Sequence, residues 1–177
     1  MNTFRLAILP LLALAVLAPL AGCDDAIDIE AHRRGTATSY MIAAANPLAA
    51  EAGRKILADG GSAVDAAIAT EMVLTLVEPQ SSGIGGGAFL VHHDAADGKL
   101  ETYDGRETAP ASAHPGMFLT PDGTPMRWPD AALGGRAVGV PGVLRMLALA
   151  HADHGILPWA DLFEPAIKLA EDGFDVS

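Results

Sequence analysis

Four glycines within five positions, Gly83, Gly85, Gly86 and Gly87, constrain this chain more than any other feature of its sequence. Together with Ala88 they satisfy the letters of the dinucleotide-binding fingerprint G-x-G-x-x-G/A. A dinucleotide site needs a strand, then the loop, then a helix, because the amides at the helix N-terminus meet the pyrophosphate. Here an apolar segment of helical period precedes the loop, and AFLVHH, which is typical of a strand, follows it. We therefore predict that the loop binds no nucleotide, and that its glycines allow positive-φ turns and close backbone packing.

Capping signals predict two helices before the glycine loop. Asn46 followed by Pro47 is typical of a helix start, and the helix is expected to end near residue 59, just before a glycine. Ser62 with Asp65 three residues later resembles a capping box. The helix that follows extends through residue 76 and is apolar nearly all round, so we expect it to be buried.

The segments after the loop predict a β-hairpin and further helices. The expected elements are strands at 88–93 and 100–104 joined by a turn at 94–99, irregular chain or short helices over 108–142, a helix at about 142–151, and one or two helices within 158–171. The sequence thus predicts a mixed α and β body that contains no internal repeat.

Composition limits the classes of protein that this chain can belong to. Half of its 177 residues are apolar, so a core can form without disulfides or metals. The formal net charge is −11, which disfavours a nucleic-acid partner because phosphate binding needs clustered Lys and Arg.

The N-terminus predicts export. Arg5 is followed by an apolar run that ends in Leu-Ala-Gly-Cys at residues 20–23, which is the layout of a secretory signal. Because Cys23 is the only cysteine and has this spacing, we expect a lipoprotein signal peptide at 1–22, lipidation of Cys23, and a polar tether at 23–39. The chain would then be an exported bacterial lipoprotein, anchored by lipid to the membrane on the periplasmic or extracellular side. The alternative is a plain signal peptide that lies beside a cysteine.

Two pairs of histidines were considered as metal ligands. His92 and His93 are adjacent on a strand, so their side chains point to opposite faces and they are interpreted as ordinary strand residues. His151 and His154 lie three residues apart near a helix end, a geometry that could hold a metal. Because no carboxylate lies at ligand spacing in the sequence, we interpret this pair as complementing the helix dipole and predict no metal site.

Arg106 is the strongest candidate binding residue. It follows the second predicted strand within Asp-Gly-Arg-Glu-Thr at 104–108 and leads into a loop, where binding residues commonly lie. Its planar guanidinium suits bidentate capture of a carboxylate, and the alternative is an ion pair with Asp104 or Glu107. No nucleophile stands out, since the chain has no Gly-x-Ser-x-Gly and its only cysteine is Cys23.

Five blocks in register carry a resemblance to a known family. They are GGSAVDAAIA at 60–69, EPQSSGIGGGAFL at 78–90, DGRETAP at 104–110, AVGVPG at 137–142 and LPWADLFEPAIKLAEDGFDVS at 157–177. In their order and spacing they resemble the γ-glutamyltransferase (glutathione hydrolase) family. One departure is Ser62, where the family usually has Asn, and a small polar N-cap is kept either way.

The resemblance implies a fold and a reaction. The family has the N-terminal-nucleophile hydrolase fold, an α+β αββα sandwich, of which residues 40–177 would form only the N-terminal part of the large subunit. Its precursor cleaves itself, and the N-terminal Thr of the small subunit takes the γ-glutamyl group of glutathione and passes it to water or to an amino acid or peptide acceptor. The family's Arg in the DGRETAP block binds the substrate α-carboxylate, so this role is expected for Arg106. No cofactor is implied.

The same resemblance implies that this chain lacks the catalytic group. The nucleophilic Thr is expected downstream of Ser177, in a small subunit from the same precursor, so the chain alone is expected to be inactive. Two rivals stay open: a β-lactam or glutaryl acylase of the same fold, and a non-catalytic lipoprotein that binds small acidic ligands.

Overall fold

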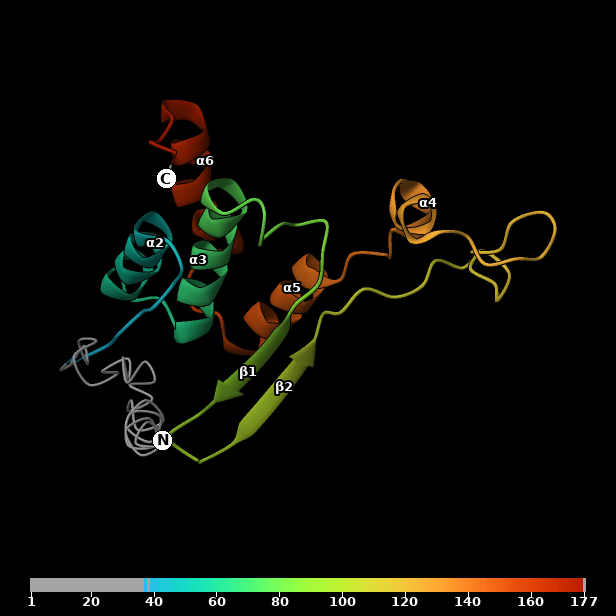
Figure 1. Cartoon of the computed structure of the whole chain (residues 1–177). Helices are drawn as coiled ribbons and strands as arrows, with labels where there is room; N and C mark the ends of the chain where they lie inside the picture. Colours follow the sequence, from blue (N-terminus) through green and yellow to red (C-terminus); the bar gives the residue numbers. More distant parts are fainter. Residues whose placement is uncertain (1–36, 38, 177) are drawn as a thin grey trace, which may run out of the picture. The chain divides into compact units, whose positions relative to one another are not determined.

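The computed structural model describes residues 37 and 39–176 (Figure 1). The predicted signal peptide at 1–22, Cys23 and nearly all of the predicted tether at 23–39 lie outside the described residues. The described elements are α2 (Pro47–Ala58), α3 (Ala63–Val77), β1 (Phe89–His93), β2 (Leu100–Asp104), α4 (Trp128–Ala132), η1 (Gly135–Ala137), α5 (Val143–His154), η2 (Trp159–Leu162) and α6 (Glu164–Asp172). The expected mixture of helices and a hairpin is confirmed.

Both predicted N-caps are present. The Asn46 side chain accepts a hydrogen bond from the backbone N–H of Leu48 at 2.9 Å, and Pro47 occupies the first position of α2. At the start of α3, the Ser62 hydroxyl accepts from Asp65 N at 3.0 Å while the Asp65 carboxylate accepts from Ser62 N at 2.8 Å. This reciprocal pair is the capping box that the sequence predicts.

Helix α3 is the central element of the core, as its apolar sequence predicts. It packs against α2, α5, α6 and η2. The main cluster of buried residues contains Ile56, Val64, Ala66, Ile68, Ala69, Met72, Tyr103, Val143, Met146, Leu147, Ala150 and Leu162. Because these side chains come from α2, α3, β2, α5 and η2, one core joins the helices to the hairpin.

Asp65 links the start of α3 to the chain that follows α5. Its side chain is fully buried, and besides Ser62 N its Oδ2 accepts from Ile156 N at 3.0 Å and Leu157 N at 3.1 Å. Burial raises the pKa of this carboxyl, but the three backbone donors outweigh burial, so its pKa lies below the ordinary value. Asp65 is therefore a buried, ionised link between two segments that are about ninety residues apart.

The hairpin pairs β1 with β2 in antiparallel register, and His92 lies directly opposite Glu101. Alternate residues face opposite sides. Leu90, His92, Glu101 and Tyr103 are half-buried or buried, and β2 contacts α5, so this face of the hairpin lies toward that helix. The other face is exposed and carries the apolar side chains of Phe89, Val91 and Leu100.

The C-terminal half follows the sequence prediction with one difference. The segment 108–142 contains only short helices, α4 and η1, and the last predicted helices are η2 and α6. Helix α5 extends to His154, three residues beyond the predicted end. Its last turn is held by Tyr103, whose hydroxyl lies 2.9 Å from both Asp153 Oδ2 and His154 Nε2. Within residues 37 and 39–176, no helix has both the length and the hydropathy needed to cross a membrane.

We predict that Asp65→Asn lowers the free energy of unfolding by about 2–3 kcal/mol, because charge-assisted bonds to buried N–H groups are weakened or lost. The control is Asp59→Asn, which removes an exposed ion pair with Lys55 and should change stability by less than about 1 kcal/mol. Chemical unfolding of the complete protein measures both. Equal effects of the two variants would contradict the role of Asp65.

A comparison of wild type with Asp65→Asn at different pH values tests whether the charge of Asp65 stabilises the protein. Because its pKa is lower in the folded than in the unfolded state, its stabilisation is present above the ordinary pKa of 3.8 and is lost as the pH falls below it. The stability difference between wild type and Asp65→Asn should therefore shrink below about pH 4. A difference that is constant from pH 7 to pH 3 would show that the carboxylate charge contributes nothing.

Candidate functional site

The glycine loop joins α3 to β1 and docks on the start of α5. The carbonyl oxygen of Gly86 accepts from Gly142 N at 3.2 Å and from Val143 N at 3.3 Å. The predicted order of helix, loop and strand is confirmed. The first amides of α5 are thus used by the loop's own backbone, which is the opposite of a loop that offers free amides to a phosphate.

Close packing explains one glycine of the loop in particular. A Cβ on Gly87 would lie 2.7 Å from the carbonyl oxygen of Gly105 and 2.9 Å from Cα of Arg106. A Cβ on Gly83 or Gly85 would meet nothing within 4 Å. The predicted close approach is therefore confirmed at Gly87, where the loop passes directly over the backbone that carries Arg106.

The prediction of positive-φ turns in the loop is wrong. The described glycines with positive φ are Gly60, Gly98, Gly123, Gly134 and Gly173, and none of these belongs to the loop. The loop makes its turns with ordinary backbone angles, so any glycine there without a close neighbour is not required for backbone conformation.

Arg106 lies just after β2, where the hairpin ladder continues through Gly105, whose N–H donates to the Ala88 carbonyl at 2.9 Å. Its own N–H donates to Asp104 Oδ1 at 2.9 Å, which fixes the backbone. Its Nη1 lies 3.7 Å from Glu107 Oε2, and its side chain is 69% exposed. The ion pair with Glu107 is thus longer than a hydrogen bond, and most of the guanidinium faces solvent.

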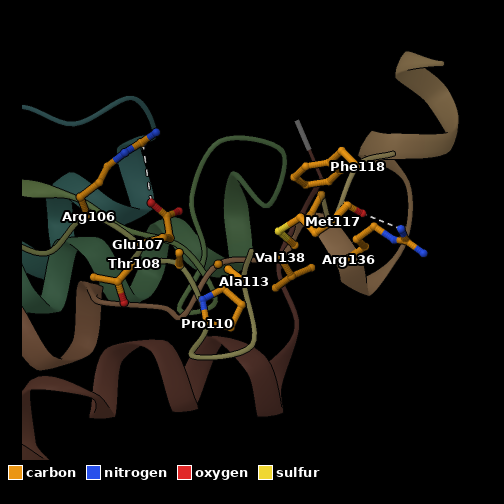
Figure 2. Close-up of a pocket in the computed structure, with 12 residues that line it drawn as sticks. Arg106, Glu107, Thr108, Pro110, Ala113, Met117, Phe118, Arg136 and Val138 are labelled. Carbon is orange, nitrogen blue, oxygen red and sulfur yellow. Dashed lines mark hydrogen bonds and ion pairs between the residues drawn. The ribbon is translucent and has the colours of Figure 1, made fainter. Parts of the chain in front are cut away.

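A pocket of about 390 Å³ opens beside Arg106 (Figure 2). Arg106 and Glu107 stand at one end, and Met117, Phe118 and Arg136 at the other. The complete lining is Arg106, Glu107, Thr108, Ala109, Pro110, Ala113, Met117, Phe118, Arg136, Ala137, Val138 and Gly139. The pocket therefore has an apolar middle, an arginine beside a glutamate at one end and a second arginine at the other, so a ligand carboxylate has an arginine to pair with.

A short bridge shapes this pocket from two distant segments. Thr108 pairs with Val140, with Val140 N donating to Thr108 O at 2.8 Å and Thr108 N to Val140 O at 3.3 Å. Glu107 is partly buried, and its Oε2 accepts no hydrogen bond from the described residues. This buried carboxylate oxygen lies 3.7 Å from Arg106 Nη1, so its interaction with the guanidinium is an ion pair without a hydrogen bond.

Arg136 was missed by the sequence analysis. Its Nη1 donates to the carbonyl oxygen of Met117 at 2.6 Å, which ties η1 to the loop on the far side of the pocket. The only signal in the sequence is an Arg directly after two glycines, and this pattern is too common to indicate a site. Its place in the pocket depends on folding of the whole 108–142 segment.

His92 and His93 point to opposite faces as predicted, but the argument about the carboxylates near His151 and His154 is incomplete. His92 is half-buried and His93 is exposed, so they face opposite sides of the hairpin. His151 Nε2 lies 2.9 Å from Leu157 O, whereas His154 Nε2 lies 3.0 Å from Glu101 Oε2. His154 therefore does have a carboxylate nearby, which the local sequence spacing could not reveal because it comes from β2.

Solved structures that resemble this chain define its fold class. The structure is similar to gamma-glutamyltranspeptidase from Helicobacter pylori, with a TM-score of 0.75 and 37% identity over 82% of this chain and 41% of that one. It is also similar to cephalosporin acylase from Bacillus halodurans, with a TM-score of 0.62 and 33% identity over 82% and 27% of the two chains. The fold is thus that of the N-terminal-nucleophile hydrolases, of which the described residues form a partial domain, as the resemblance implied.

The sequence then defines the family. A model of the gamma-glutamyltranspeptidase family matches residues 49–177. The glutathione hydrolase proenzyme of Bacillus subtilis is 43% identical over 136 residues, which cover 77% of this chain and 23% of that protein. The chain belongs to the gamma-glutamyltranspeptidase family, as the five sequence blocks indicated. It spans between 20% and 28% of the length of the curated relatives that it matches.

We predict that Gly87→Ala destabilises the protein by about 1–3 kcal/mol, because its Cβ would collide with backbone atoms that cannot move aside cheaply. Gly85→Ala is the matched control, since its Cβ points into open space, and its effect should stay within about 0.5 kcal/mol. Thermal unfolding of the complete protein compares the two. If Gly87→Ala is as stable as the wild type, the loop is not in close contact with the Arg106 backbone.

Proposed function

We propose that this chain is the N-terminal part of a glutathione hydrolase that is also a γ-glutamyl transferase, and that it acts on glutathione and related γ-glutamyl compounds. The observation that carries this proposal is Arg106, whose mostly exposed guanidinium stands at one end of a pocket of about 390 Å³. Membership of the family supports it. In the proposed role, Arg106 pairs with the α-carboxylate of the γ-glutamyl group by two parallel N–H···O bonds.

The proposed reaction uses a nucleophile that the 177 residues do not supply. A Thr at the N-terminus of a small subunit, downstream of Ser177, attacks the γ-glutamyl amide, and its own α-amine takes the hydroxyl proton. The amine of the leaving group receives a proton as the amide bond breaks, leaving a γ-glutamyl ester on the Thr. Water, an amino acid or a peptide then attacks the ester. In this scheme the present chain binds and orients the substrate, and alone it hydrolyses no γ-glutamyl anilide.

The hairpin supports the idea that a further part of the protein packs on this chain. Phe89, Val91 and Leu100 expose between 64% and 68% of their surface on the face that points away from α5. A row of large apolar side chains on one sheet face is typical of a surface that another layer covers. We propose that the small subunit from the same precursor supplies this layer.

The nearest rival is a β-lactam or glutaryl acylase, and the similarity to a cephalosporin acylase gives it specific support. A glutaryl carboxylate could use Arg106 as well as an α-carboxylate does. The rates of the complete protein on glutathione and on glutaryl-7-aminocephalosporanic acid separate the two reactions. Faster hydrolysis of the glutaryl compound would favour the acylase. A complete protein without a downstream Thr nucleophile would favour the third reading, a non-catalytic lipoprotein that binds small acidic ligands.

We predict that Arg106→Ala in the complete protein weakens γ-glutamyl binding by about 2–4 kcal/mol, because the substrate α-carboxylate, which loses its water on binding, then has no charged partner. This corresponds to a rise in KM of roughly 30- to 700-fold. Arg106→Lys should restore only part of the loss, since an ammonium cannot form the bidentate pair.

The matched control for this variant is Arg54→Ala. Arg54 is also an exposed arginine paired with a nearby glutamate, Glu51, but it lies on α2 and does not line the pocket. Its loss should leave KM unchanged within about twofold. A wild-type KM for Arg106→Ala would overturn the assigned role.

We also propose that the protein is an exported bacterial lipoprotein, anchored to the membrane on the periplasmic or extracellular side through a lipidated Cys23. The sequence Leu-Ala-Gly-Cys and the single cysteine support this proposal. Mass spectrometry of the mature protein should find Cys23 at its N-terminus with a lipid attached, and Cys23→Ser should release the protein from the membrane fraction. An unmodified thiol at Cys23 would refute the anchor.

A further inference from the structure

A cluster of imidazole and carboxylate groups lies where the C-terminal end of α5 meets the hairpin. His92, Glu101 and His154 each offer one ligand atom, and these atoms all lie within 4.8 Å of one another. His154 Nε2 is 3.0 Å from Glu101 Oε2, and the rings of His92 and His154 are stacked with centroids 3.9 Å apart. This cluster is distinct from the pocket beside Arg106, since none of its members lines that pocket.

Backbone geometry brings the three groups together. His92 and Glu101 are direct cross-strand partners, so their side chains stand next to each other on one face of the hairpin. His154 is the last residue of α5, the helix that this face packs against. Two strands and a helix thus each fix one group, which is more order than exposed side chains on a single loop would have.

Neighbouring groups fix the orientation of the cluster's members. Lys99 Nζ lies 2.7 Å from Glu101 Oε1, which leaves the other carboxylate oxygen, Oε2, turned toward His154. The Tyr103 hydroxyl donates to Asp153 Oδ2 at 2.9 Å and lies 2.9 Å from His154 Nε2, so β2 also holds the end of α5 through this side chain.

One nitrogen atom of the cluster lacks a hydrogen-bond partner among the described residues. This atom is Nδ1 of His92, which is buried. A buried ring nitrogen without a partner is costly, and a metal ion bound to this nitrogen would supply the missing partner.

We infer that His92, Glu101 and His154 form a binding site for a divalent transition-metal ion, for which Zn²⁺ is the best match. Two imidazole nitrogens and one carboxylate oxygen are ligands that Zn²⁺ takes at about 2.0–2.2 Å, with water in the fourth position. Mg²⁺ and Ca²⁺ prefer sets made only of oxygen. Tetrahedral ligands at that distance stand roughly 3.4 Å apart, so modest side-chain rotations that unstack the two rings complete the site.

The site's place in the fold indicates a structural role. Glu101 and Arg106 are five residues apart along an extended segment, which corresponds to roughly 16 Å. The ion would therefore lie too far from Arg106 to act on a ligand that this arginine binds. It would instead fasten the hairpin to the end of α5, so that the strand leading to Arg106 moves less.

The test uses the complete protein, stripped with a chelator and dialysed against Zn²⁺ at pH 7.5, with bound metal counted by mass spectrometry. Wild type should bind one ion per chain. His92→Ala should lower the affinity by at least about 100-fold, since even loss of an outer partner typically lowers it 10- to 100-fold. His93→Ala is the matched control: it removes the neighbouring histidine on the other face of the same strand and should change affinity by less than about twofold.

A second variant and a second readout guard against misfolding. Glu101→Gln keeps the size of the side chain and should also weaken binding, while circular dichroism verifies the fold. Co²⁺ in wild type should show the intense visible absorption of a four-coordinate site, and Glu101→Gln should alter that spectrum. Wild type that binds no Zn²⁺, or binding that survives both His92→Ala and Glu101→Gln, would overturn the inference.

Discussion

The buried carboxylate of Asp65 is the interaction on which the rest of the structure depends. It caps α3 and at the same time accepts from two backbone N–H groups just after α5, so it fixes the end of α5 against the start of α3. Both ends of α5 then serve the hairpin. N–H groups at the start of α5 donate to the Gly86 carbonyl oxygen, and the last turn contacts Tyr103 and Glu101. The position of Arg106 therefore depends on Asp65 through one helix.

The second constraint is that glycines occupy the place where three segments of the backbone are in contact. Gly87 lies over the Gly105–Arg106 backbone, and a Cβ on Gly142 would lie 2.4 Å from the carbonyl oxygen of Gly105. A glycine at each of these positions lets the loop, the end of β2 and the start of α5 come into direct contact. The glycine-rich stretch thus acts together with glycines elsewhere in the chain, and their close contacts place the backbone of Arg106.

Features with a local cause could be predicted from the sequence. The caps at Asn46 and Ser62 were correct because a cap needs only residues within three positions. The predicted order of helix, loop and strand was also correct, and this order was the reason to predict that the loop binds no nucleotide. Arg106 could be singled out because DGRETAP is a contiguous block, and its role stays a prediction.

Features that depend on long-range contacts could not be predicted. Arg136 reaches the pocket only because the 108–142 segment folds back to pair Thr108 with Val140. His92 and His154 were each weighed with their sequence neighbours, yet their partners in space come from other elements. The end of α5 was placed too early because Tyr103, which holds the last turn, lies about fifty residues away.

Arg106 is proposed to bind the substrate's α-carboxylate. The most direct test is a cycle on the complete protein that compares γ-glutamyl p-nitroanilide with its α-methyl ester, in wild type and in Arg106→Ala. Masking the carboxylate should lower kcat/KM of wild type by roughly 100-fold, or about 2.7 kcal/mol, and that of Arg106→Ala by less than about threefold. An equal loss in both proteins would contradict the claim, because the carboxylate would then be bound by a group other than Arg106.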